Sequence, residues 1–440
     1  MRTVGIICEY NPFHNGHLRQ LRLAREMAGE DCALVCLMSG NYVQRGEPAL
    51  FPKGLRAEAT VRCGADLVLE LPLTVALTSA EGFAAGGVAI LSALGCDFLC
   101  FGTETGDLDA LRRTAAANLD PAFDSQVRAE LESGCSYASA RQRALETLGA
   151  GAGLSTPNDI LAVEYLKALL RRNSPMTPLP IQRPDTYHAA SLDPEAPSAS
   201  ALRRVLTMPS PWGEGAEQSE ADEGVRRTAS GIWSRADGCV STSSAPVCAL
   251  GHLPLKGKAL EPCVQPWRRA VPEALHALYE SAPIHTWQAG ERAALAILRT
   301  LPDEAFAVLP FGSEGLWSKL MKASRSCAST AEIIEATKSK RYSYSRVQRM
   351  LLCAVLGLSR ADLETPPPYV RILGFNQKGR TLLREMKSRF PLVNAGQRPA
   401  DAAYYALERR AADLYSLFSD AGPRPAGEED RLRVTFLKAK

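Results

Sequence analysis

The stretch TVGIICEYNPFHNGH, residues 3–17, decides the fold. Its first part, TVGIIC, is a β-branched apolar run, which predicts a buried parallel strand. The apolar spacing that starts at His17 predicts an amphipathic helix over residues 17–27. Between the two, one tight turn holds a glycine and two histidines. The chain therefore opens with a predicted strand, a polar turn and a helix.

The alternation of strand and helix continues beyond this stretch. ALVCLMSGN (33–41) predicts a second strand that ends in a glycine turn, and residues 56–72 and 83–104 each predict a helix followed by a strand. This order predicts an α/β domain with a doubly wound, Rossmann-like parallel sheet. Because sites in such sheets gather at the carboxyl ends of the strands, NPFHNGH, SGN (39–41) and FGTE (101–104) are expected to meet at one edge.

The chain divides into three predicted domains. Residues 1–206 hold the α/β domain, which includes helices predicted at 157–170 and 198–206. Residues 207–265 are rich in Ser, Gly, Pro, Ala and Glu without apolar periodicity, which predicts a disordered, low-complexity insertion or linker. Residues 266–440 are dominated by amphipathic helices, and we expect a mostly helical, basic C-terminal region.

Composition excludes several classes of protein. The net charge is only +3, so overall charge gives no argument for nucleic-acid binding and any basic surface must be local. The 12 cysteines form neither a CxxC pair nor a zinc spacing, which is typical of reduced thiols in a cytosolic protein. The N-terminus lacks the features of a signal peptide, and charges, proline and glycines interrupt the longest apolar region, residues 66–102. We therefore expect a soluble cytoplasmic protein with no membrane span.

The turn HNGH, residues 14–17, fits the pattern H-x-G-H and suits nucleotide chemistry. Gly16 has no side chain, so a base or phosphate can approach the backbone closely. The helix that starts near His17 offers free N–H groups to a phosphate. His14 and His17 can donate hydrogen bonds to an α-phosphate as negative charge builds in the transition state. Two alternatives remain open: a helix-capping arrangement, and a zinc site, for which no third ligand is evident nearby.

A second candidate element is SASALR, residues 198–203. Ser200 at the helix start and Arg203 one turn later would grip an anion, with hydroxyl and N–H groups at the cap and the guanidinium on phosphate oxygens. The alternative is an ordinary capped helix on the surface. Only the combination with H-x-G-H favours phosphate binding.

Six strings, in order along the chain, resemble the bacterial tRNA(Met) cytidine acetate ligase family of the HIGH-motif nucleotidyltransferase superfamily. They are GIICEYNPFHNGH, MSGNYVQRGEPA, PNDILAVEYLKAL, PFGSEGL, SKRYSYSRVQRMLL and YVRILGFNQKGR. The resemblance covers the chain except residues 207–265. It implies that residues 1–206 form a HIGH-type nucleotidyltransferase domain that binds ATP and is catalytic, and that the C-terminal region binds tRNA.

The resemblance also implies an activity. Enzymes of this family use ATP to activate acetate as acetyl-adenylate with release of pyrophosphate. They then acetylate N4 of the wobble cytidine of elongator tRNA(Met), which forms N4-acetylcytidine. Positioning and charge stabilisation can carry the first step, with Mg²⁺ neutralising the triphosphate. The resemblance implies His14 and His17 as the catalytic residues and no protein metal site.

The family's ATP contacts map onto matching positions of this chain. Gly102, Asn158 and Arg183 should contact the nucleotide, beside Ser200 and Arg203. By themselves, Asn158 reads as a helix-start residue and Arg183 as a surface charge. Pro184 departs from the family's pattern and removes a backbone donor, which puts backbone contacts to ATP after Arg183 in doubt. The first loop should wrap the nucleotide with Ile7, Cys8, Glu9, Tyr10, Asn11, Pro12, Phe13, His14, Asn15, Gly16, His17, Leu18, Arg19 and Gln20.

Two basic clusters in the C-terminal half predict tRNA binding. The first interleaves its cations with Tyr342 and Tyr344, a pattern that suits phosphate contacts and base stacking. The alternative is solvated helix faces. The first cluster holds Lys338, Lys340, Arg341, Arg346 and Arg349, and the second holds Arg371, Lys378, Arg380, Arg384, Lys387 and Arg389.

Two other functions compete with the ligase. One is a small-molecule adenylyltransferase of the same superfamily that acts on a phosphorylated vitamin precursor. The long helical C-terminal half argues against it, because such enzymes are compact single domains. The other is a non-enzymatic RNA-binding protein with a degenerate nucleotide site, and the intact His14, Gly16 and His17 argue against that.

Overall fold

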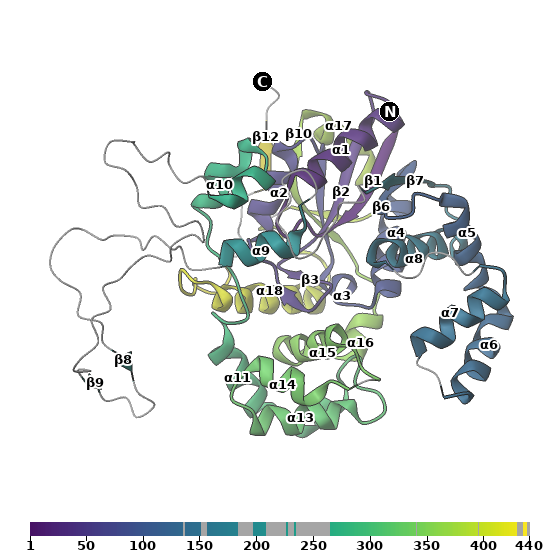
Figure 1. Cartoon of the computed structure of the whole chain (residues 1–440). Coiled ribbons are helices and arrows are strands. Elements are labelled where there is room, and N and C mark those ends of the chain that lie inside the picture. The colour runs from purple at the N-terminus through teal and green to yellow at the C-terminus, as the bar shows by residue number, and fades with distance from the viewer. Residues whose placement is uncertain are drawn as a thin grey trace, which may run out of the picture.

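A large mostly parallel sheet forms the centre of the protein (Figure 1). The computed structural model describes residues 1–134, 137–150, 156–183, 197–207, 226–227, 233–234, 265–339, 341–394, 396–428 and 434–437. The strand order is β11-β10-β5-β2-β1-β6-β7, with β12 beside β10. The parallel strands are β1 (Thr3–Cys8), β2 (Ala33–Ser39), β5 (Leu67–Leu71), β6 (Phe98–Thr103) and β7 (Thr177–Gln182).

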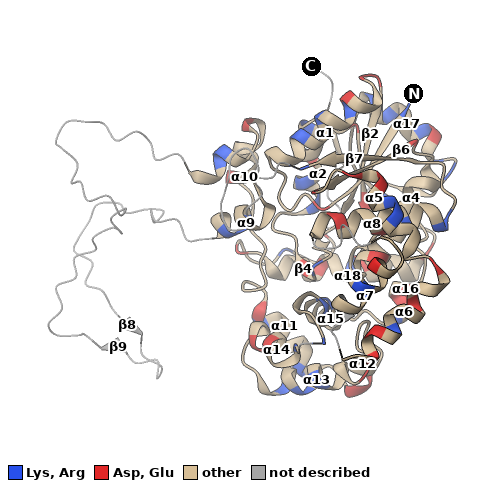
Figure 2. Ribbon diagram, turned by 45° about the vertical axis from the view of Figure 1, so that its right-hand side comes forward, with Lys and Arg blue, Asp and Glu red and all other residues tan. Residues whose placement is uncertain are grey.

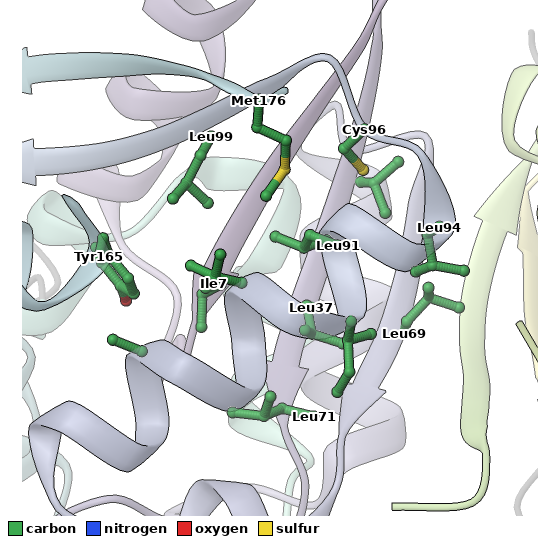
Figure 3. Close-up of a cluster of buried hydrophobic side chains, with 14 of the residues drawn as sticks. Ile7, Leu37, Leu69, Leu71, Leu91, Leu94, Cys96, Leu99, Tyr165 and Met176 are labelled. Atoms are coloured by element: carbon green, nitrogen blue, oxygen red, sulfur yellow. The ribbon is translucent and has the colours of Figure 1, made fainter. Parts of the chain in front are cut away.

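Helices cover both faces of the sheet, because successive side chains of each buried strand point to opposite faces. On one face, Ile7, Val35 and Leu37 join a cluster with α4 (Ala80–Leu94) and α8 (Pro157–Arg171), part of which Figure 3 shows. The other face packs against α1 (Asn15–Ala28), α2 (Lys53–Arg62) and α9 (Ala199–Thr207). The predicted doubly wound α/β architecture is therefore confirmed.

Helix α4 packs against β1 through two glycines. A Cβ atom added at Gly5 would lie 2.7 Å from Leu91 Cδ1, and one added at Gly87 would lie 2.5 Å from Ile7 Cδ1. A larger residue at either position would have to displace one of these buried side chains, so the two glycines allow close packing of α4 on β1. Strand β1 then ends beneath the helix layer, with its carboxyl end next to those of β2 and β6.

The C-terminal part of the chain returns to the sheet. Strand β10 (Val370–Asn376) pairs antiparallel with β5, and β11 (Leu392–Val393) and β12 (Thr435–Leu437) pair parallel with β10. Helix α17 (Gln377–Met386) follows β10. Because β10 runs against β5, α17 begins at the amino edge of the parallel strands. The predicted domain 266–440 thus supplies strands to the sheet of the predicted domain 1–206.

A third layer of helices packs below the carboxyl edge of the sheet (Figure 1). Tyr42 and Leu77, from the first half of the chain, join its apolar cluster. The hairpin of β3 (Tyr42–Val43) and β4 (Glu47–Pro48) touches this layer at Gly46, where an added Cβ would lie 2.6 Å from Arg349 N. The layer's helices are α11 (Glu291–Thr300), α12 (Asp303–Ala307), α13 (Leu316–Ser326), α14 (Thr330–Thr337), α15 (Tyr344–Leu356) and α18 (Ala402–Tyr415).

The remaining elements are short or peripheral. Helices α5 to α7 project from the far side of α8, and residues of α6 and α7 form a small apolar cluster of their own (Figure 1). Within the described residues, no helix has the length and apolar character needed to cross a membrane. These short or peripheral elements are α3 (Leu73–Ala76), α5 (Leu108–Ala117), α6 (Pro121–Glu132), α7 (Tyr137–Thr147), α10 (His276–Glu280), α16 (Arg360–Glu364), the 3₁₀ turns Pro266–Ala270, Glu273–Leu275 and Ser416–Phe418, and the pair β8 (Arg226–Arg227) and β9 (Trp233–Ser234).

Candidate active site

The turn after β1 is fixed by two aromatic anchors. Tyr10 and Phe13 are buried, with rings 4.9 Å apart, and Tyr10 adopts a positive φ of 43°. The Tyr279 hydroxyl donates to the Phe13 carbonyl at 3.0 Å. These contacts reverse the chain between β1 and α1, which begins at Asn15, two residues before the predicted start.

The two histidines cap helix α1. His14 is the N-cap, and its Nδ1 accepts a hydrogen bond from Gly16 N at 3.1 Å. His17 Nδ1 accepts one from His14 N at 3.3 Å, and the two rings stack with centroids 3.7 Å apart. Because each Nδ1 is an acceptor, each neutral imidazole carries its proton on Nε2. The capping alternative is therefore correct, and it fixes both rings as Nε2–H donors.

Both histidines are held neutral. Burial, together with the positive charges of Arg183 and Arg203, lowers the pKa of His14 to about 3. Burial, then His14 and Arg183, lowers the pKa of His17 well below its ordinary value. Each neutral ring can donate a hydrogen bond from Nε2–H to a phosphate oxygen. The turn thus presents two uncharged donors side by side.

His14 makes the protein acid-sensitive. A histidine neutral in the folded state contributes stability that is present above its unfolded pKa near 6.5 and is lost as pH falls toward the folded value. Between pH 7 and pH 5, protonation of His14 in the unfolded state lowers the free energy of unfolding by about 2 kcal/mol. In His14→Asn the asparagine keeps the cap but does not titrate, so we expect its urea-unfolding midpoint to fall less than that of the wild type over this interval. An equal fall in both proteins would contradict the assignment.

The two glycines of the site act differently. A Cβ at Gly16 would lie 3.0 Å from His14 Cε1, so the glycine makes room for the capping ring. A Cβ at Gly102, in contrast, would meet only the Arg183 side chain, at 3.8 Å. Gly102 therefore lines open space at the end of β6.

A cavity of about 370 Å³ lies over the carboxyl ends of β1, β6 and β7. Its volume falls within the range of small-molecule sites. NPFHNGH and FGTE both reach it, as the sheet topology predicted, whereas SGN (39–41) does not line it. The predicted residues that line it are Ile7, Cys8, Glu9, Tyr10, Asn11, His14, Gly16, His17, Arg19, Gln20, Gly102, Asn158, Arg183 and Arg203.

The other five predicted contacts do not line the cavity, each for a visible reason. Pro12 and Phe13 are buried in the turn, and Leu18 packs against the apolar core. Asn15 Nδ2 donates to the Arg269 carbonyl at 2.9 Å. Ser200 accepts from Arg203 Nη2 at 3.3 Å. These side chains hold the loop and α9 in place.

Asn158 and the start of α8 are held by Glu104. The Glu104 carboxylate accepts from Asn158 Nδ2 at 2.5 Å and from Asp159 N at 3.0 Å. The carboxylate therefore occupies the amino end of α8, and Asn158 is fixed against the cavity wall. The helix-start interpretation and the cavity position are both correct for this residue.

Arg203 ties α9 to the histidine turn. Its Nη1 donates to the Asn11 carbonyl at 2.7 Å, and Nη2 lies 3.9 Å from Glu47 Oε2. Arg183 reaches the same cavity from the end of β7, where its N–H donates to the Thr103 carbonyl at 2.9 Å. Pro184 lies outside the described residues, so the expectation about its missing donor stays a prediction.

Sequence reasoning missed one cation of the cavity, Arg45. It lies in the loop of the β3–β4 hairpin, which follows β2, and it is exposed. Its guanidinium makes no hydrogen bond or ion pair with the described residues. The string MSGNYVQRGEPA contains it, and its place just after a strand was the signal. An apolar wall was also missed, formed by Phe83, Phe101, Leu161, Tyr165 and Ile181. The lining of the cavity therefore combines arginine side chains with an apolar, aromatic wall.

Comparison with known proteins agrees with this geometry. The family model described as HIGH Nucleotidyl Transferase matches residues 1–229 and 255–430. A tRNA(Met) cytidine acetate ligase of Acetivibrio thermocellus is 32% identical over 99% of this chain and 100% of its own length. One of a Geobacillus species is 30% identical over 97% of this chain and 96% of its own. The chain belongs to the tRNA(Met) cytidine acetate ligase family.

A solved structure supports the same assignment. The crystal structure of Thermotoga maritima TmcAL bound with alpha-thio ATP is 27% identical, covers 100% of both chains and superposes with a TM-score of 0.77. Since the matches to the ligase family span both the sheet and the third helical layer, the two halves of the chain belong to one family protein. This finding excludes an unrelated domain appended to a compact adenylyltransferase.

Proposed function

We propose that this protein is an ATP-dependent tRNA(Met) cytidine acetate ligase that acts in the cytoplasm. The observation that carries the proposal is the pair of neutral, stacked Nε2–H donors at the amino end of helix α1. The chain that holds them is similar over its whole length to ligases of that name. The size of the cavity and its arginines suit ATP, and the aromatic wall suits the adenine ring.

The first step is attack by an acetate oxygen on the α-phosphorus of ATP. The new P–O bond forms as the bond to pyrophosphate breaks, and negative charge grows on the phosphoryl oxygens. His14 and His17 donate from Nε2 to those oxygens, a form of preorganised electrostatic stabilisation. Arg45, Arg183 and Arg203 lie around the same cavity and bind the triphosphate.

Magnesium enters with the nucleotide in this proposal. Among the described residues, no group of three or more His, Cys, Asp or Glu side chains could hold a resident metal. Mg²⁺ in nucleotide sites is commonly held by phosphates with one or two carboxylates, and the lining residues fit that mode because they include a carboxylate, Glu9. The ion supplies charge neutralisation of the triphosphate when bound.

The elements that carry the two predicted tRNA-binding clusters lie apart: α17 is near the top of Figure 2 and α15 is in its lower half. The second lies on and around α17, at the amino edge of the sheet, whereas the first lies at and before the start of α15, in the third helical layer. Two predicted phosphate contacts are wrong: Arg349 and Arg371 are only 8% and 4% exposed, and Arg371 pairs with Glu408 at 3.0 Å. Lys340 lies outside the described residues.

Within the first cluster, several side chains serve the fold. Arg346 donates to the Phe311 carbonyl at 3.0 Å, and the Tyr342 hydroxyl donates to Glu314 at 2.6 Å. Arg341 also pairs with Glu314, at 2.7 Å, yet stays exposed. Reversing Arg346 would therefore disturb the loop at 311–314 as well as any RNA contact. We infer that the tRNA contacts of this cluster come from its exposed members.

Tyr344 is the aromatic residue best placed to stack on an RNA base. It is 47% exposed at the start of α15, one helical turn before Gln348, which donates to Glu47 beside Arg203. We expect Tyr344→Ala to raise the KM for tRNA about tenfold, the typical worth of one stacked base. Acetate-dependent ATP–pyrophosphate exchange should not change, and Tyr344→Phe should behave as wild type. A fall in exchange equal to the fall in tRNA acetylation would contradict this role.

The proposed function is tested by incubating the purified protein with ATP, Mg²⁺, labelled acetate and elongator tRNA(Met). Label on the wobble cytidine, located by nuclease digestion and mass analysis, is the expected result. Absence of label on tRNA, with transfer of adenylate to another acid or phosphate, would instead favour the small-molecule adenylyltransferase. A tRNA lacking the wobble cytidine is the control.

A further inference from the structure

An arginine-bearing surface that belongs to neither predicted cluster lies beside the cavity. It is formed by the exposed side of α1 and by the turn Pro266–Ala270, which precedes α10 and packs with α1 and α9 in one apolar cluster (Figure 2). Asn15 Nδ2, in the first turn of α1, donates to the Arg269 carbonyl at 2.9 Å. The turn is therefore joined to the end of α1 that faces the cavity.

The exposed side of α1 continues from Asn15 through Arg19 to Arg22. Side chains three and four residues apart lie on one side of a helix, about 5–6 Å from each other at Cβ. Arg19 lines the cavity, and its Nη1 donates to the Gln182 carbonyl at 3.1 Å. The arginine stripe thus starts at the cavity and runs outward along α1.

Arg22 lies where α1 meets the end of α2. Burial raises the pKa of Cys63 to about 12, and the nearby charges of Arg22 and Arg62 oppose that rise. Arg62 in turn reaches the Ala274 carbonyl, a few residues beyond Arg269, at 3.4 Å. The segment that carries Arg269 therefore runs alongside the outer end of the stripe as well as its start.

The charges on this surface are not balanced. Two neighbouring arginines have carboxylate partners, since Arg62 pairs with Glu58 and Arg268 with Glu280. In contrast, Arg22 and Arg269 are exposed, and neither side chain forms an ion pair or hydrogen bond with the described residues. Like charges close together on a helix surface repel each other. An anion bound between them would remove that repulsion.

The proposed reaction brings a polyanion to this place. For the wobble cytidine to enter the cavity, the phosphates on either side of that nucleotide must lie on the surface around it. Neither Arg22 nor Arg269 lines the cavity, so neither is needed to bind ATP. The planar guanidinium group matches phosphate oxygens in a bidentate manner.

We propose that Arg22 and Arg269 bind RNA phosphates that flank the wobble nucleotide of the tRNA. This inference rests on the proposed ligase function and names a contact surface for its RNA substrate. The tRNA then spans the cavity, from α1 to the exposed members of the first cluster in the third helical layer.

The test is the double variant Arg22→Gln/Arg269→Gln, with the affinity for labelled elongator tRNA(Met) measured by fluorescence anisotropy over a salt series. Each contact to a phosphate of single-stranded nucleic acid contributes about 0.7 to the slope of log affinity against log salt. Loss of two contacts should reduce the slope by about 1.4, which is a loss of about 25-fold at about 0.1 M salt if the two proteins converge near 1 M. Acetate-dependent ATP–pyrophosphate exchange should not change.

Two further variants serve as controls. Arg22→Lys/Arg269→Lys keeps both charges and should keep the wild-type salt slope. Arg112→Gln/Arg113→Gln removes two exposed arginines from α5, beyond α8, and should bind tRNA as wild type. An equal loss of affinity in the α5 variant would show that only net charge matters, and would overturn the proposal.

The remaining outcomes separate the surface from the reaction. If Arg22→Gln/Arg269→Gln keeps the wild-type salt slope while wild type acetylates tRNA, the ligase function stands and the proposed surface fails. If its exchange rate falls as much as its tRNA affinity, the arginines serve the fold or the nucleotide, and the proposed surface fails again. If wild type binds tRNA through these arginines but never acetylates it, the surface stands and the proposed function fails.

Discussion

Replacing His17 by alanine is expected to lower the rate of acetate-dependent ATP–pyrophosphate exchange by about 100- to 1,000-fold, the usual cost of one donor to a transition-state oxyanion. The structure gives the reason. His17 is a neutral donor, with its Nδ1 occupied by His14 N at 3.3 Å and its ring stacked on that of His14. Alanine removes the Nε2–H group from the cavity.

The same substitution also removes an acceptor from the helix cap, so a second variant separates the two effects. In His17→Gln the amide oxygen can accept from His14 N, as in an ordinary capping box, while the amide nitrogen can still donate. We expect an exchange rate between those of wild type and His17→Ala, with thermal unfolding close to wild type. A His17→Ala protein that keeps its exchange rate within fivefold would remove His17 from the mechanism.

Replacing Arg56 by methionine is expected to have the largest effect on stability. Arg56 is fully buried, and its guanidinium donates to the carbonyls of Phe51 at 2.9 Å, Glu9 at 2.5 Å and Ser39 at 3.0 Å, and also to that of Gly40. Each carbonyl left without a donor costs about 1–3 kcal/mol. We therefore expect the free energy of unfolding to fall by about 4 kcal/mol or more, a large share of a typical total.

Urea denaturation followed by circular dichroism measures this fall. Arg62→Met, on the same helix, is the matched control: its side chain is 39% exposed and pairs with Glu58, so it should change stability by less than about 1 kcal/mol. Arg56→Lys keeps the charge but loses the planar guanidinium with its several donors. Its free energy of unfolding should lie between those of Arg56→Met and Arg62→Met. An Arg56→Met protein as stable as Arg62→Met would contradict the central role of this side chain.

The alternation of strands and helices in the first half of the chain could be predicted because it depends on local pattern. The run TVGIIC reads as a buried strand, and the polar turn after it marks the carboxyl edge. The start of α1 was missed by two residues because His14 is not a common cap residue. The resemblance to a family, rather than spacing, pointed to Asn158 and Arg183.

What could not be predicted depends on contacts between distant segments. The segment at 370–376 reads as a strand, but nothing in its pattern says that it pairs antiparallel with β5. Arg349 and Arg371 look like the exposed arginines beside them, and only the packing of Phe311 and Glu408 against them shows their burial. Likewise, the orientation of the Glu9 carboxylate depends on a hydrogen bond from Gln44 N, in the loop after the next strand.

The glycine at the tip of the β3–β4 hairpin limits how this protein can evolve. Gly46 has a φ of +84°, and a Cβ there would lie 2.6 Å from the backbone of Arg349, so any other residue must push α15 away. Gln44, which orients Glu9, sits two residues before it and accepts from Arg349 Nη1 at 3.3 Å. A chimaera that takes its C-terminal half from a distant relative would therefore misplace a cavity residue encoded in the first half. The two halves must be inherited together and are not exchangeable modules.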